Sequence, residues 1–156
     1  MTRELITSWT DYQAAVDQLL AQPANKLLIF DHDLAHLQLD TPAHHEALVQ
    51  QLHHGARIRI VVRDASRLRA QHPRLMRLLA THTHQLAIHE TPASLAHLRD
   101  SLLLRDDQDG LIRFEQALPR SKILLAESEE LRPYLLRFDE IWLERGDAIH
   151  YDVSGL

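Results

Sequence analysis

The chain has 156 residues, 45% of them hydrophobic and 25% charged, a composition that fits one globular domain with its own core. It has no cysteine, which excludes disulfides, thiolate catalysis, zinc fingers and iron–sulfur clusters. Its net charge of −5 speaks against nucleic acid or anionic lipid as a partner, and four glycines are too few for a glycine-rich phosphate loop. No apolar run is long enough to span a bilayer and no signal peptide is recognisable, so we expect a cytoplasmic protein.

Hydrophobic periodicity divides the chain into helices and strands. In chain order it predicts a helix over 9–21, a strand over 26–30, a helix over 42–54, a strand over 57–64, a helix over 66–81, a strand over 85–89, short strands over 101–105, 111–114 and 123–126, and a last helix with apolar positions between 131 and 142. Thr41 is the expected N-cap of the second helix and Gly55 its C-terminal cap, while Pro73 divides or kinks the third.

The alternation of strands and helices between residues 26 and 89 predicts parallel strands joined by right-handed crossovers. We therefore expect an α/β fold with a mixed, largely parallel sheet flanked by helices. A single domain over 1–146 is expected, with a C-terminal tail over 147–156. Pro133 is expected in or near the first turn of the last helix, where proline is tolerated.

The segment from Arg99 to Asp106 resembles the His-x-Lys-x-x-x-x-Asp motif of the phospholipase D-like superfamily, with Arg99 at the His position, Ser101 at the Lys position and Asp106 at the Asp position. The passage Ala47–Asp64 and the ending Phe138-Asp139-Glu140-Ile141-Trp142 are also similar to this family. The resemblance covers roughly residues 8–144 and implies one phospholipase D-like half, of the kind found in uncharacterised bacterial proteins. Active members pair two such halves, so the resemblance also implies a homodimer or another protein partner.

The motif is degenerate in the residues that carry the chemistry. In active members the His attacks phosphorus and the Lys holds the phosphate oxygens, but the guanidinium of Arg99 has no lone pair and Ser101 has no positive charge. None of the twelve histidines is followed by Lys after two residues and Asp after seven. The sequence therefore predicts no catalytic residues of this kind, and leans against an enzyme.

Two constellations remain as candidate sites. Arg99, Ser101, Asp106 and Arg113 would form a non-reactive site for a phosphate-containing ligand if the arginines project into the former cleft; the competing interpretation is surface ion pairing. His32, Asp33 and His36 follow the first predicted buried strand, where α/β folds place ligands. With Asp31 they are candidate metal ligands if the segment is helical; the competing interpretation is a capped loop with solvated histidines.

The preferred hypothesis is a non-catalytic domain with a binding or scaffolding role and no cofactor. The first alternative is a metal-dependent hydrolase or phosphodiesterase that uses the segment from Asp31 to His36. The second is a nucleic-acid-binding remnant. For the second alternative, the sequence offers a concentration of arginines between residues 57 and 77, a weak signal because few aromatic residues accompany it.

Overall fold

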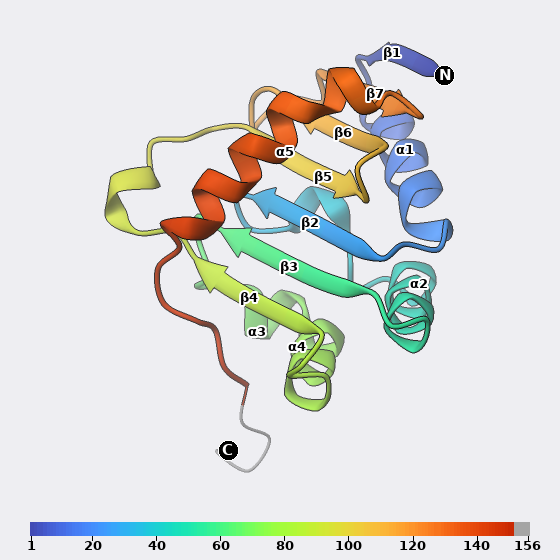
Figure 1. Cartoon of the computed structure of the whole chain (residues 1–156). Helices are drawn as coiled ribbons and strands as arrows, with labels where there is room; N and C mark the ends of the chain where they lie inside the picture. The colour runs from blue at the N-terminus through green and yellow to red at the C-terminus, as the bar shows by residue number, and fades with distance from the viewer. Residues whose placement is uncertain (152–156) are drawn as a thin grey trace.

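The computed structural model describes residues 1–151 and shows one seven-stranded sheet between two layers of helix (Figure 1). In chain order the elements, with η for a short 3-10 helix, are β1 (Thr2–Ile6), α1 (Trp9–Ala21), β2 (Lys26–Asp31), η1 (Ala35–Leu37), α2 (Pro42–His53), β3 (Arg57–Val62), α3 (Leu68–Gln71), α4 (Pro73–Thr81), β4 (Leu86–Glu90), η2 (Ala93–Leu95), β5 (Ser101–Arg105), β6 (Asp109–Arg113), β7 (Ser121–Leu125) and α5 (Ser128–Leu143).

The sheet is mixed, as the sequence predicts, with the strand order β1-β7-β6-β5-β2-β3-β4. The strands β2, β3 and β4 are parallel and joined through helices, whereas β5, β6, β7 and β1 pair antiparallel. The parallel strands come from the alternating half of the sequence, and the antiparallel strands from the half with short strands and tight turns. The α/β class, the mixed sheet and the flanking helices are therefore confirmed. The sheet is not largely parallel as expected, because four of its six strand pairings are antiparallel.

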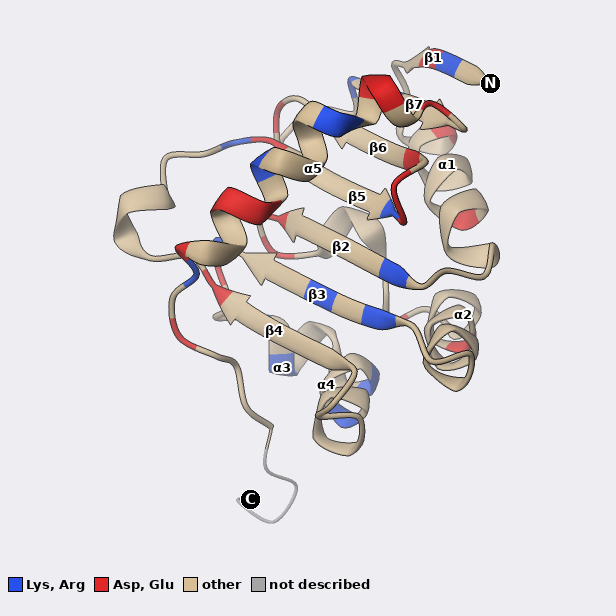
Figure 2. Cartoon of the chain, in the orientation of Figure 1, with Lys and Arg blue, Asp and Glu red and all other residues tan. Residues whose placement is uncertain are grey.

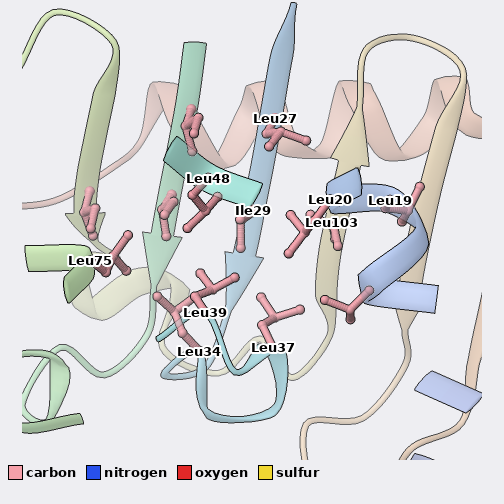
Figure 3. Close-up of a cluster of buried hydrophobic side chains, with 14 of the residues drawn as sticks. Leu19, Leu20, Leu27, Ile29, Leu34, Leu37, Leu39, Leu48, Leu75 and Leu103 are labelled. Atoms are coloured by element: carbon pink, nitrogen blue, oxygen red, sulfur yellow. The ribbon is translucent and has the colours of Figure 1, made fainter. Parts of the chain in front are cut away.

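The helices α1–α4 cover one face of the sheet and α5 crosses the other (Figure 1). On the first face, leucines of α1, α2 and α4 pack against β2 and β5, and Figure 3 shows Ile29 and Leu103 among them. On the second face, Leu131, Phe138 and Ile141 of α5 pack against Phe30 and its neighbours. Each face thus has its own apolar cluster, and burial on both faces explains why β2 reads as a continuous apolar run.

The predicted caps of α2 are confirmed. The Thr41 side chain accepts a hydrogen bond from the backbone N–H of His44, and Pro42 is the first helical residue. Gly55 follows the helix with φ of 85°, a left-handed conformation that glycine adopts without steric cost. Pro73 separates α3 from α4 as expected.

Two local features refine the expectations. The first residues, over which no strand is predicted, form β1, which pairs with β7. Pro133 is the sixth residue of α5, just beyond its first turn. Because proline has no N–H, it leaves the carbonyl of Glu129 without its helical partner, and Glu129 is exposed.

The predicted tail is partly built into the sheet edge. Residues 147–151 run beside β4: the N–H of Glu90 donates to the carbonyl of Asp147 at 3.0 Å, and the N–H of Ile149 donates to the carbonyl of Ile88 at 2.7 Å. Residues 152–156 of the predicted tail lie outside the described residues. Within residues 1–151, no helix is long and apolar enough to cross a membrane.

Candidate functional site

The antiparallel register gathers three polar residues at one end of the sheet. Asp31 ends β2, Ser101 begins β5 and Arg113 ends β6. Phe30 is opposite Leu102 and Ser101 is opposite Arg113, so the three residues occupy adjacent positions on neighbouring strands. This end of the sheet also receives the carboxyl ends of the parallel strands, which is where open α/β sheets bind ligands.

The three side chains form a closed hydrogen-bond network, which we call the buried triad. Arg113 donates from Nη2 to Asp31 Oδ1 at 2.8 Å and to Ser101 Oγ at 3.1 Å, while Ser101 Oγ donates to the same Asp31 oxygen at 2.5 Å. The second carboxylate oxygen accepts from the backbone N–H groups of Leu34 and Asp33 at 2.7 and 3.2 Å. Arg113 and Asp31 are each 1% exposed and Ser101 is 3% exposed. The triad is therefore a desolvated, paired group.

Aromatic rings and backbone carbonyls hold the guanidinium of Arg113 in place. It lies 5.4 Å from the centre of the Trp9 ring and 5.2 Å from that of Tyr12. Its Nη1 donates to the carbonyls of Glu115 and Gln116 at 3.3 and 2.5 Å. Burial raises the pKa of Tyr12 to about 12, against the opposing effect of the nearby Arg113. The guanidinium of Arg113 is thus buried and bound to groups of the protein itself.

Arg99 lies outside this network, on the surface. Its guanidinium makes a two-pronged contact with the carboxylate of Glu115, with Nε 2.8 Å from each oxygen and Nη2 2.5 Å from Oε1. The Arg99 side chain is 57% exposed, so this is a solvated ion pair. The residue at the His position of the motif thus faces solvent.

Asp106 lies at the opposite end of the β5–β6 hairpin from Ser101. It adopts a left-handed backbone conformation with φ of 50°, and its Oδ1 accepts from the N–H groups of Asn25 and Lys26 at 2.9 and 3.0 Å. Asp106 therefore fixes the start of β2. Of the four residues predicted to bind a phosphate-containing ligand, the structure brings together Ser101 and Arg113, and separates Arg99 and Asp106. Phosphate binding by these residues stays a prediction.

The segment that carries the candidate metal ligands is not a helix. It turns through Leu34, whose φ is 70°, into the short η1, and so His32 and His36 do not share a helical face. The ring of His36 stacks on Trp9 with 3.9 Å between ring centres, and burial lowers its pKa. Asp33 accepts from the N–H of Ala35 at 3.0 Å, as a loop-capping residue does. Within residues 1–151 no three His, Asp or Glu side chains are grouped as a metal site.

The sequence did not predict that Asp31 pairs with Arg113, nor that Arg63 lies beside the buried triad. Arg63 follows β3, donates to the carbonyl of Asp100 at 2.7 Å and to Gln116 Oε1 at 3.1 Å, and lies over the Phe30 ring. Burial lowers its pKa, against the opposing effect of the carboxylates of Asp31 and Asp100. The signal for Asp31 was available, because a carboxylate that directly ends an apolar, doubly covered strand requires a buried partner.

The comparisons with known proteins decide the family. A family model described as "Domain of unknown function (DUF7931)" matches residues 8–150. The chain belongs to this family. No curated protein matches it in sequence.

Solved structures show what fold this family has. The phospholipase D family member Nuc from Salmonella typhimurium superposes with a TM-score of 0.65 and 11% identity, covering 96% of this chain and 98% of Nuc. NucT from Helicobacter pylori gives 0.62 and 7%, covering 92% and 97%. The archaeal chromatin protein TrmBL2, whose structure shows a mode of DNA binding, gives 0.70 and 12%, covering 93% of this chain and 53% of TrmBL2.

This DUF7931 chain thus spans about half the length of TrmBL2 and nearly the whole of Nuc. The likeness establishes that the chain has the phospholipase D-like fold. At these identities it establishes the fold alone.

Proposed function

We propose that this domain is a non-catalytic phospholipase D-like module with a binding or scaffolding role. The observation that carries the proposal is the buried triad. At the start of the motif strand, where a reacting phosphate would need access, the space is filled by the paired guanidinium of Arg113, and Arg99 is exposed and bound to Glu115.

Ser101 is the one hydroxyl in the triad, and its hydrogen bond to Asp31 resembles a nucleophile with its base. A nucleophile must touch the substrate atom that it attacks, and Ser101 is 3% exposed with Arg113 packed over its oxygen. The guanidinium of Arg99 has no lone pair to attack with. Both facts support the proposal that the motif strand has become structural.

A turnover assay tests the proposal directly. Purified protein is incubated with bis(p-nitrophenyl) phosphate, with and without added magnesium, manganese or zinc, and release of nitrophenolate is followed. We expect rates equal to buffer alone for the wild type, for Arg99→Ala and for His36→Ala. Metal-dependent turnover that survives Arg99→Ala and is lost in His36→Ala would overturn the proposal and favour the hydrolase alternative.

The binding partner in this proposal includes a second copy of the chain. Phe114 and Leu118 lie in the connection between β6 and β7, next to the buried triad, and are 43% and 55% exposed. If these two side chains meet in one apolar patch, that patch would serve as an interface, and a self-complementary patch closes as a twofold dimer. Light scattering coupled to gel filtration is expected to give twice the monomer mass, and Phe114→Ser with Leu118→Ser is expected to give the monomer mass. A wild-type monomer at high concentration would contradict this part of the proposal.

A further inference from the structure

One part of the α5 face of the sheet is uncovered. The helix α5 crosses this face diagonally and leaves the first residues of β2 and β3 in the open, and Figure 2 shows positive charges there. Leu28 and Val61 face α5. Because side chains alternate along a strand, Lys26 on β2 and Arg57 and Arg59 on β3 point to the same side. These three residues, with Arg145 beyond the end of α5, are called the cationic strip.

The cationic strip is electrostatically unfavourable within the isolated chain. Lys26 is directly opposite Arg57 in the β2–β3 register, and Arg59 is two residues further along the same strand. Like charges at opposed sheet positions destabilise a sheet. Lys26 Nζ forms an ion pair with Asp107 Oδ1 at 2.8 Å. Within residues 1–151 neither Arg57 nor Arg59 has a carboxylate at ion-pair distance. An uncompensated positive row in a chain of net charge −5 suggests that something else neutralises it.

Trp142 holds two of these guanidiniums in position. The guanidinium carbon of Arg59 lies 4.9 Å from the centre of a Trp142 ring and that of Arg145 lies 4.4 Å away. Arg145 also donates to the carbonyl of Trp142 at 2.8 Å, and His89 packs edge-on against the ring at 5.1 Å. Two arginines fixed on one ring are pre-organised donors for oxyanions, with less side-chain freedom to lose on binding.

We propose that the cationic strip binds the phosphate backbone of single-stranded nucleic acid. This inference rests on the binding role proposed above and names its partner class. A protein partner would require apolar anchors, whereas the floor beside the strip offers Ala87 and the nearly buried Leu28. A row of charges about 7 Å apart along one strand suits a repeating polyanion. The α5 helix packs on the sheet beside the strip and, at a diameter of about 10 Å, forms a wall along it. A flexible single strand therefore reaches the floor more easily than a rigid duplex.

The test is fluorescence anisotropy with a labelled oligo(dT) of about 16 nucleotides, a length that spans a typical single-strand site. We expect binding at low salt. A plot of the logarithm of the association constant against the logarithm of the salt concentration should have a slope of about −3, because each of four phosphate contacts on a single strand contributes about −0.7. Arg57→Glu with Arg59→Glu is expected to weaken binding at least tenfold and to make the slope shallower by about 1.4.

The matched control is Arg67→Glu with Arg77→Glu, which changes the net charge equally at exposed positions on the opposite side of the sheet. This control is expected to bind within about twofold of the wild type, because it leaves the cationic strip intact. If overall charge alone caused binding, the two double variants would be weakened alike. Arg57→Glu places an opposite charge beside Lys26, so the melting temperature of this single variant is expected not to fall. In Trp9→Phe protein, Trp142 is the remaining tryptophan and its emission should change on binding.

Three results would overturn the inference: no binding of oligo(dT) at low salt, equal loss in the two double variants, or equally tight binding of the annealed duplex. Each of these results leaves the non-catalytic assignment intact, because turnover is measured separately.

Discussion

Arg113 and Asp31 lie 82 residues apart in the sequence and form an ion pair of 2.8 Å with both side chains 1% exposed. The pair joins β6 to β2 across β5, and Ser101 of β5 donates its hydroxyl to the same carboxylate oxygen. A pair this deeply buried gains little over apolar packing, but leaving either charge alone is costly. At the end of the sheet that would hold an active site, the folded state therefore requires both charges of this pair.

Removal of one partner of this pair should therefore destabilise the domain strongly. Arg113→Met or Asp31→Asn is expected to lower the free energy of unfolding by about 3–5 kcal/mol each. The double variant should lose clearly less than the sum, because the second change no longer strands a charge. Urea unfolding followed by circular dichroism measures all three. Arg99→Ala, which removes an exposed pair, is the control and should leave the midpoint unchanged; additive losses in the double variant would refute the coupling.

Alkaline conditions should destabilise the domain through Tyr12. Its pKa is about 12 in the folded protein because burial disfavours the phenolate, against about 10 for an unfolded tyrosine. The unfolded chain therefore loses this proton first, and stability is full below about pH 10 and falls as the pH rises from about 10 to 12. Tyrosinate absorbance should show one of the three tyrosines titrating late. Tyr12→Phe should flatten the alkaline loss of stability; an unchanged slope would exclude Tyr12 as its source.

Acid conditions should act on His72, which is 3% exposed. Burial lowers its pKa, although the nearby carboxylate of Asp40 opposes the effect. The unfolded chain then binds the proton more readily, so this contribution to stability is full above about pH 6.5 and declines as the pH falls toward the folded-state pKa. The ring protons of His72 in NMR spectra should titrate below the ordinary histidine value of about 6.5. His72→Gln should weaken the acid dependence of the unfolding midpoint, and His53→Gln should not.

The chain segment beside β4 should close the edge of the sheet. A Cβ on Gly146 would lie 2.7 Å from the carbonyl oxygen of Glu90, so the close approach at this point requires glycine. Ile149→Pro removes the N–H that donates to Ile88, and should release the segment from the edge. Hydrogen exchange at the amide of Glu90, which bonds to Asp147, should become much faster.

Ile149→Val keeps the same N–H and should leave that exchange rate near the wild-type value. Exposure of a free strand edge also favours pairing between copies, so the proline variant should associate more strongly at high concentration. Unchanged exchange at Glu90 in Ile149→Pro would show that the segment contributes nothing to the edge.

The sequence alone determined the local elements of this fold. The helix predicted over 9–21 is α1, and its apolar positions Tyr12, Ala15, Val16, Leu19 and Leu20 are all buried. Capping by Thr41, the left-handed Gly55 and the break at Pro73 followed from the same local rules. These features depend on residues within one or two turns of each other, so a short stretch of sequence carries the whole signal.

The tertiary structure decided what the motif residues became. Nothing local distinguishes Arg99, which is solvated, from Arg113, which is buried, because the difference arises from strand register: β5 and β6 bring Arg113 to Asp31 and leave Arg99 beyond the first residue of β5. The same long-range pairing set β1 against β7 and the cationic strip along two neighbouring strands. The burial of a charge and the neighbours of a strand depend on residues tens of positions away, and the sequence reveals them only once the sheet is assembled.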